Sequence, residues 1–309
     1  MTLSVGGLGG IIYLPAAIAH HGGYFEEEGI QVTVVDTKGG ADAAKALIGG
    51  SADFAAMSVE HALKAKAQGT DLVVVAGFTR LSGLSLIVDS RYAHRVRKVE
   101  DLKGMRVGVS SLGSGTHMAL QALLEKVGMK PSDVEVVSVG TTTMAPAMEV
   151  GSIQAAMHFD PFAMHLVMQN KAYILFDLAT EKDTLWLYGT EYPFTGLVTR
   201  REVLEQKPEL VQRMVNAIMR AHRFIAESDL ESIAAVLPAE YRANESVYMK
   251  SLEHSKPTLA PTGQLTPESL EAVVQALKRS GTLPADAQID VASVLEMSFV
   301  KKVQAAMAD

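Results

Sequence analysis

Short apolar segments alternate with segments of helical periodicity through the first two thirds of the chain. The short segments are rich in Val and Ala, are bounded by Gly, Asp or Ser, and lie at 31–35, 53–57, 72–77, 105–109, 134–139 and 153–157. Apolar runs of this length are typical of buried parallel strands. Leucines recur at helical spacing between residues 120 and 127, and Gly128 ends that helix. The pattern predicts an α/β architecture.

The last third of the chain has a different pattern. Pro208 and the pair Thr266 and Pro267 each open a segment with apolar residues on one helical face. We therefore expect the C-terminal part to be mostly helical. A basic stretch at 91–98 raises the alternative of a polyanion site, but a few solvated charges before a strand favour an exposed surface loop.

Composition narrows the class of protein. With 309 residues, 48% of them hydrophobic, the chain is long enough for two lobes. No apolar run approaches the roughly 18 residues of a membrane-spanning helix. A net charge of −7 argues against nucleic acid as a partner. The absence of cysteine excludes disulfides, zinc–thiolate sites and thiol nucleophiles.

The segment 104–116 carries the clearest chemical signal. A short apolar strand leads into a loop of small residues and then directly into a helix. The first amides of a helix have no intrahelical partner, and the helix dipole places about half a positive charge beside them. The segment therefore predicts a binding loop for a small anionic or strongly polar molecule, with hydroxyls from Ser110, Ser111, Ser114 and Thr116 and close approach at Gly115.

Two nucleotide-binding loops are excluded by the same residues. Gly108 and Gly113 have the spacing of a phosphate loop, but Ser114 stands where the lysine is required. The glycine-rich run at 7–10 fails as a dinucleotide fingerprint, because Ile12 occupies a glycine position.

Four segments, taken in order, resemble the solute-binding proteins of ABC importers for sulfonates, nitrate, taurine and thiamine-precursor pyrimidines. They are 15–34 with the sequence GYFEEEG, 46–55 with a Gly-x-x-Asp turn, 102–139 with the anion-binding loop, and 150–162 with an acidic residue before Pro161. The chain departs from the family pattern at Gln154, where an aspartate is usual. It departs again at His158 and Asp160, which replace a common Trp–Glu pair, so we expect altered specificity on this side of the site.

The resemblance implies a two-lobed periplasmic-binding-protein fold of type II-like topology. Each lobe is expected to be a mostly parallel sheet flanked by helices, with two hinge crossovers at 84–89 and 194–199. The first lobe is expected to be discontinuous, comprising 1–84 and the helical part 199–309, with the second lobe at 85–198. The ligand is expected in the cleft between the lobes.

The resemblance also implies a function. We expect a monomeric receptor on the periplasmic or extracellular side of the membrane, which binds a small organic anion and delivers it to an ABC permease. It would meet the membrane only through the permease or a removed lipid anchor; the N-terminus shows no leader, so either the protein is not exported or the sequence begins after cleavage. No cofactor, metal or nucleic acid is expected. Ligand contacts to both lobes would shift the population to the closed state.

Ligands of open parallel sheets collect just past the carboxyl ends of strands, which selects the candidate site residues. In the first lobe they are Leu8, Gly9, Tyr13, Met57, Ser58 and Arg80. Arg80 suits a bidentate contact to a carboxylate or sulfonate, and the alternative is a solvated loop arginine. Ser58 is equally well placed as a helix cap, and Glu60 is expected to be a first-turn acid that the helix dipole favours.

In the second lobe the candidates are Ser110, Ser111, Ser114, Gly115, Thr116, His158, Phe159 and Asp160, with Phe194 on the second crossover. Phe159 is expected to stack on an aromatic ligand while His158 donates a hydrogen bond. The structural alternatives are a packed histidine, and a helix cap for Asp160. Phe194, Tyr188 and Trp186, the only tryptophan, are expected near the cleft, with ordinary core packing as the alternative.

Catalysis is not expected from the sequence. There is no Gly-x-Ser-x-Gly elbow and no His-Glu-x-x-His helix, and the nine histidines are scattered without metal-ligand spacing. The enzymatic alternative comes from within the family, since eukaryotic pyrimidine synthases for thiamine share the fold. Their cysteine-rich signature is absent from a chain without cysteine. Sulfonate, carboxylate and pyrimidine ligands all stay open.

Overall fold

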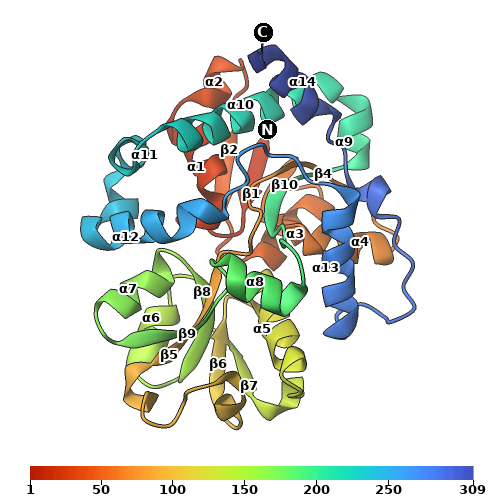
Figure 1. Ribbon diagram of the computed structural model, residues 1–309. Helices are drawn as coiled ribbons and strands as arrows, with labels where there is room; N and C mark the ends of the chain where they lie inside the picture. Colours follow the sequence, from red (N-terminus) through yellow and green to blue (C-terminus); the bar gives the residue numbers. More distant parts are fainter. Residues whose placement is uncertain (309) are drawn as a thin grey trace.

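The computed structural model describes residues 1–308 and consists of two lobes, each built around a five-stranded sheet (Figure 1). The first sheet has the order β2-β1-β3-β10-β4, with β1 (Thr2–Val5), β2 (Thr33–Asp36), β3 (Phe54–Ser58), β4 (Leu72–Gly77) and β10 (Thr195–Arg200). The second has the order β7-β6-β8-β5-β9, with β5 (Leu84–Asp89), β6 (Arg106–Val109), β7 (Glu135–Ser138), β8 (Ala155–Phe159) and β9 (Ala172–Asp177). The two-lobed α/β prediction is confirmed.

One strand in each sheet runs against the other four. β10 is antiparallel to β3 and β4, and β5 is antiparallel to β8 and β9. The remaining pairings within the two sheets are parallel. Both sheets are therefore mostly parallel, as the sequence predicted.

The expected positions of the two crossovers are wrong by several residues. The segments 84–89 and 194–199 are almost entirely strand, and each is hydrogen-bonded on both sides inside one sheet. An extended apolar segment satisfies its backbone best between two neighbouring strands, rather than in the open between two lobes. The chain passes between the sheets just before each strand, at 78–83 and 189–194, and the expected boundary after residue 198 falls inside β10.

Helices cover both sheets (Figure 1). The first lobe carries α1 (Leu14–His21), α2 (Tyr24–Glu27), α3 (Gly40–Ile48), α4 (Glu60–Ala67), α9 (Arg201–Gln206), α10 (Pro208–Glu227), α11 (Leu230–Val236), α12 (Glu245–Ser255), α13 (Pro267–Arg279) and α14 (Ser298–Ala308). The second carries α5 (Gly115–Lys126), α6 (Met144–Glu149), α7 (Phe162–Met168) and α8 (Glu181–Tyr188). Short 3₁₀ turns occur at Ile11–Tyr13, Ser90–Tyr92, Val99–Leu102, Pro131–Asp133, Ala239–Arg242, Lys256–Thr258 and Val291–Val294.

The helical C-terminal part is confirmed, and its start signals act as expected. Pro208 is the first residue of α10, and Thr266 caps α13 by accepting a hydrogen bond from the Ser269 amide at 3.2 Å. Two of these helices also touch the second lobe, because α12 packs against α7 and α13 against α5. No helix within residues 1–308 has both the length and the apolar character needed to cross a bilayer.

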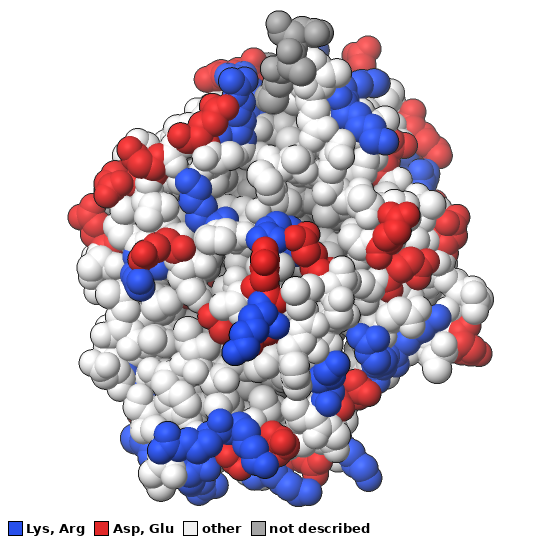
Figure 2. Space-filling view, in the orientation of Figure 1, with Lys and Arg blue, Asp and Glu red and all other residues white. Residues whose placement is uncertain are grey.

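The basic stretch at 91–98 lies on the surface, as the sequence analysis favoured. Its arginines and Lys98 are exposed, and Arg91 is paired with Asp89 of β5. In Figure 2, Lys and Arg side chains gather at the free end of the second lobe, where the chain continues from β5. This charge lies at the end of the molecule away from the junction of the lobes.

Aromatic rings pack against glycines where the two lobes meet. Phe159, at the end of β8, lies against Gly7 and Gly10 of the first lobe, and a Cβ atom at Gly10 would stand 2.7 Å from its Cδ2. Phe194, just before β10, lies against Gly115, where a Cβ atom would stand 2.7 Å from its Cε2. The Ile11 amide also donates to the Asp160 carbonyl across the junction at 2.9 Å. Glycine at these positions thus permits close contact between the lobes.

The substitution Gly115→Ala tests this packing. The new methyl group overlaps the buried Phe194 ring, so we expect a loss of about 1–3 kcal/mol of unfolding free energy in chemical denaturation. The double variant Gly115→Ala with Phe194→Leu should recover part of that loss, because the shorter side chain leaves room. Equal stability of Gly115→Ala and the parent protein would contradict the packing described here.

Candidate functional site

A small enclosed cavity lies between the two lobes. Its volume is about 10 Å³, which is the space of roughly one water molecule. The first-lobe side and the second crossing segment contribute Gly6, Ile12, Tyr13, Gly40, Ser58 and Phe194, and the second lobe contributes Ser110, Ser114, Gly115, Thr116 and Phe159. The lining brings together eight of the residues proposed from the sequence. Among the residues that the structure describes, no lysine or arginine lines this cavity.

The beginning of α5 forms the second-lobe wall. The predicted strand, loop and helix are present as β6, the loop 110–114 and α5. Ser114 caps the helix by accepting a hydrogen bond from the His117 amide at 3.4 Å. Within residues 1–308, the amides of Gly115 and Thr116 donate to no acceptor. Gly115 and Thr116 line the cavity, so the N-terminus of α5 and the positive end of its dipole lie there.

Three hydroxyl groups brace the loop before α5. The oxygens of Ser110, Ser114 and Thr116 lie 2.9 Å from one another, and the Ser110 amide donates to Thr116 Oγ1 at 3.0 Å. All three residues are buried. The cluster holds the loop in one conformation, so the free amides are already oriented. Ser111 lies outside the cluster, with its hydroxyl buried beside Gly39.

The opposite wall holds a buried carboxylic acid. Glu60 accepts hydrogen bonds from Ser58 at 2.7 Å and from the Tyr192 hydroxyl at 2.5 Å. Burial raises the pKa of Glu60 to about 7, against the lowering effect of these two hydrogen bonds. The expectation of an ordinary first-turn acid missed this burial. Ser58 lines the cavity and donates to Glu60, so a charge on Glu60 lies directly behind the cavity wall.

Histidine His61, next to Glu60, is also buried. Burial lowers the pKa of His61 to about 3, and Lys64 adds to that effect, so the ring is neutral. Its Nε2 atom lies beside Gly40 and has no hydrogen-bond partner among the described residues. The first-lobe wall therefore carries no permanent positive charge to attract an anion.

Arg80 is not brought to the cavity. Its guanidinium binds Glu181 at 2.5 Å and also Glu191, while Nε donates to the Pro257 carbonyl at 3.3 Å. Two protein carboxylates thus occupy the terminal N–H donors that the sequence analysis assigned to a ligand. Glu181 and Glu191 follow β9 in the chain, so Arg80 ties the first crossing segment to the second.

His158 and Asp160 lie behind the cavity rather than in its lining. The His158 ring is fully buried, stacks on Phe162 with centroids 5.1 Å apart and contacts the Thr141 carbonyl through Nε2 at 2.8 Å. Burial lowers the pKa of His158 to about 4. Asp160 accepts a hydrogen bond from the Met164 amide of α7 at 3.1 Å. Both side chains therefore have the packing and capping contacts that were weighed as alternatives.

The remaining candidates are spread around the cavity. Met57 and Leu8 are buried and do not line it, and Gly9 faces Tyr241 and Phe162. Tyr241 and Phe162 border a second interlobe groove of about 350 Å³, between α7 of the second lobe and the start of α12. Residues Gly6, Ile12, Gly40 and Tyr192 were missed by the sequence analysis. Gly6 and Ile12 follow β1 and Gly40 begins α3, and only Tyr192 lies in a segment that crosses between the lobes.

Trp186 does not lie in the cleft. Its side chain is 48% exposed on α8, packs against Phe176 with ring centroids 5.4 Å apart and lies beneath Lys126. Tyr188 is buried and stacks on Tyr192 at 3.7 Å, whereas Phe194 does line the cavity. Within residues 1–308, no cluster of three or more His, Cys, Asp or Glu residues has the geometry of a metal site.

Comparison with known proteins agrees with this architecture. The NMT1/THI5-like family model matches residues 13–231. The taurine-binding periplasmic protein of Escherichia coli is 25% identical over 300 residues, which are 93% of this chain and 89% of that protein. A 4-amino-5-hydroxymethyl-2-methylpyrimidine phosphate synthase of Saccharomyces cerevisiae is 21% identical over 257 residues, covering 78% and 71% of the two chains.

Solved structures show the same fold. A protein from Bordetella bronchiseptica superposes with a TM-score of 0.94 at 29% identity, covering 100% of this chain and 98% of that one. The alkanesulfonate-binding protein SsuA from Xanthomonas axonopodis, bound to MOPS, superposes with a TM-score of 0.76 at 21% identity, covering 96% and 97%. The family match spans more than half of the sequence. The chain therefore belongs to the NMT1/THI5-like family, and its two-lobed fold is that of the periplasmic binding proteins.

Proposed function

We propose that this protein is an extracytoplasmic receptor that binds a small organic anion between its lobes and delivers it to an ABC importer. The observation that carries the proposal is the pair of free amides at Gly115 and Thr116, which open onto an interlobe cavity. A sulfonate or carboxylate accepts hydrogen bonds from such amides and gains from the helix dipole. The binding-protein names of several relatives support this class of function.

Binding requires the lobes to separate first. A cavity of about 10 Å³ is too small for an organic anion, so the ligand enters an open form and the lobes then close around it. Contacts to α5 on one side and to Tyr13 and Ser58 on the other favour the closed form. A ligand that touches only one lobe has no such preference and would not drive closure.

A second candidate is binding of a thiamine-precursor pyrimidine, or synthesis of such a compound. Three aromatic residues line the cavity, namely Tyr13, Phe159 and Phe194, and a planar ring stacks well on such surfaces. The yeast relative is named as a pyrimidine phosphate synthase. The neutral donors at α5 and the absence of cysteine favour the anion receptor over the synthase.

Calorimetric titration distinguishes these functions. The probes are ethanesulfonate, benzoate and 4-amino-5-hydroxymethyl-2-methylpyrimidine, each also tested for a rise in melting temperature. We expect saturable binding of one anion class with no product formed. Turnover of the pyrimidine, or its binding in preference to both anions, would support the second candidate. Binding of none of the three would contradict the anion proposal.

The variant Thr116→Val links binding to the α5 loop. Loss of its hydroxyl removes three contacts that hold the loop, so we expect the affinity for the bound anion to fall about tenfold or more. Thr184→Val is the matched control. Thr184 is equally buried in the second lobe, and its hydroxyl donates to the Leu178 carbonyl rather than to the α5 loop. Both variants should lose about 1 kcal/mol of stability. Equal affinities in the two variants would contradict the proposed site.

Glu60 predicts a pH dependence of the same binding event. Ethanesulfonate stays ionised throughout, whereas Glu60 acquires a negative charge behind Ser58 as the pH rises through about 7. Charge repulsion should then weaken ethanesulfonate binding about tenfold between pH 6 and pH 8, as measured by calorimetry. In Glu60→Gln this dependence of the affinity on pH should be absent. An identical pH dependence of the affinity in that variant would exclude Glu60 as the cause of the effect.

The stability of the unliganded protein gives an independent check on Glu60. Its pKa is 4.5 in the unfolded chain and about 7 in the fold, so the folded state binds more protons between these values. Relative to Glu60→Gln, the unfolding free energy should be highest below pH 4.5 and fall by up to about 3 kcal/mol as the pH rises through about 7. Denaturant titrations at a series of pH values measure this difference.

A further inference from the structure

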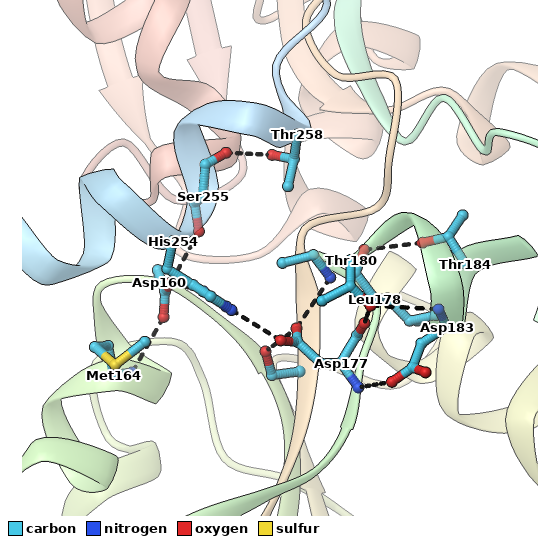
Figure 3. Close-up of polar contacts among 12 residues, drawn as sticks. Asp160, Met164, Asp177, Leu178, Thr180, Asp183, Thr184, His254, Ser255 and Thr258 are labelled. Atoms are coloured by element: carbon cyan, nitrogen blue, oxygen red, sulfur yellow. Dashed lines mark hydrogen bonds and ion pairs between the residues drawn. The ribbon is translucent and has the colours of Figure 1, made fainter.

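His254 lies between two carboxylates at the junction of the lobes (Figure 3). Its Nδ1 atom is 2.6 Å from Asp160 Oδ2, and its Nε2 atom is 2.9 Å from Asp177 Oδ2. A carboxylate accepts hydrogen bonds, so both ring nitrogens must donate, and a histidine with two donors carries a positive charge. The contact geometry therefore indicates an imidazolium ion bridging two carboxylates.

The three side chains come from different lobes. His254 belongs to α12 of the first lobe, whereas Asp160 follows β8 and Asp177 ends β9 of the second. β8 and β9 flank β5 in the second sheet, so the two carboxylates stand on either side of the strand that enters from the first lobe. The bridge thus joins α12 to two separate strands across the junction.

Each carboxylate is also fixed within its own lobe. Asp160 Oδ1 accepts from the Met164 amide, and Asp177 Oδ1 accepts from Ser85 at 3.1 Å and from the Ala179 amide at 3.0 Å. Asp160 Oδ2 accepts a second bond from the first lobe, from Ser255 at 2.8 Å. The second lobe therefore offers His254 two rigid acceptors, and opening of the lobes would separate the charges.

Other charged groups near His254 are already paired. On α12, Lys250 binds Glu253 at 2.8 Å, and beyond it Lys256 donates to the Ser228 carbonyl. On the second-lobe side, Asp183 of α8 accepts the Asp177 amide, and Arg80 is held by Glu181 and Glu191. His254 is thus the one cation paired with Asp160 and Asp177 among the described residues. Asp160 is 2% exposed, so without this cation its charge would be buried and uncompensated.

The bridge also connects to the candidate cavity. Phe159, which lines the cavity, directly precedes Asp160, and the Asp160 carbonyl accepts the Ile11 amide of the first lobe. Holding Asp160 therefore holds the Phe159 ring against Gly7 and Gly10. A contact remote from the cavity lining thereby fixes one of its walls.

We propose that His254 is a positioning residue that holds the second lobe closed on the first through Asp160 and Asp177, with or without a ligand. This role goes beyond the proposed transport function and does not depend on the identity of the ligand. It makes the closed form a substantial population of the unliganded protein, since closure places a positive charge between two carboxylates that otherwise lack a cationic partner.

The bridge has a defined pH range. The hydrogen bonds that His254 donates to Asp160 and Asp177 raise the pKa of His254 from 6.5 to about 10, against the opposing effect of burial. A histidine with a raised pKa contributes its full stabilisation below the unpaired value, and that contribution is lost as the pH rises through the raised value. The bridge should therefore stabilise the closed form fully below about pH 6.5 and lose that stabilisation progressively between about pH 6.5 and pH 10.

Distance measurement by electron spin resonance tests the proposal without any ligand. The chain lacks cysteine, so spin labels attach only to cysteines that are introduced. We place these at Met168→Cys on α7 and Glu231→Cys on α11, where both side chains are exposed. These helices lie on either side of α12 (Figure 1). At pH 7 we expect a dominant short distance. His254→Gln, which keeps a donor but loses the charge, should lower the ratio of closed to open molecules about tenfold.

Lys250→Gln is the matched control, because it removes a positive charge from the exposed face of the same helix. It should keep the short distance and the pH response of the parent protein. The parent should open progressively as the pH rises from about 6.5 to 10, whereas His254→Gln should show no such response. If His254→Gln does not fold, the pH series of the parent and Lys250→Gln still decides. A distance distribution unchanged up to pH 10.5, or unchanged in a folded His254→Gln, would overturn the proposal.

Discussion

Each sheet of this protein contains one strand that arrives directly from the other lobe, and the rest of the architecture depends on this exchange. β5 enters the second sheet between β8 and β9, and β10 enters the first between β3 and β4. Both strands are hydrogen-bonded on two sides, so neither lobe is complete without a crossing of the chain. The crossings at 78–83 and 189–194 are short and tied to each other by Arg80. The lobes can therefore rotate about one narrow region without losing their sheets.

Neutral donors and formal charges have separate places in the structure. The cavity wall uses the amides of Gly115 and Thr116 and a braced hydroxyl cluster, whereas the cations of Arg80 and His254 are bound to protein carboxylates. A fixed dipole attracts an anion without the desolvation cost of burying an unpaired cation. The charged groups instead set the relative position of the lobes. This division would let an acidic protein present the anion site that we propose.

Much of the fold follows from local sequence patterns. The apolar runs locate six strands to within about two residues, and the proline starts of α10 and α13 are accurate. β9 was missed although residues 172–176 form a continuous apolar run of the same kind. The crossings were misplaced because β5 and β10, which follow the crossings, have the same apolar character as any other buried strand. Local sequence patterns predict where strands lie, but they do not predict which strands pair with one another.

The candidate site was predictable in part for the same reason. The loop at 110–116 is a continuous motif, and its free amides lie at the interlobe cavity. Arg80 and Glu60 depend on partners more than a hundred residues away, namely Glu181 and Glu191 for Arg80 and Tyr192 for Glu60. His254 depends on Asp160 and Asp177, which are 94 and 77 residues away. A lone arginine suggested a ligand contact, and a lone acid suggested a helix start. Only the assembled lobes show that each is bound to another part of the chain.

The position of β10 also has a consequence for the order in which the protein forms during synthesis. The strands of the second sheet, from β5 to β9, occupy one continuous stretch that ends at Asp177. The first sheet cannot join β4 to β3 until residues 195–200 have emerged, because β10 lies between them. Domains fold as units as they leave the ribosome. The lobe that begins the chain is therefore the last to be completed, and its early strands wait with exposed edges while the inserted lobe forms.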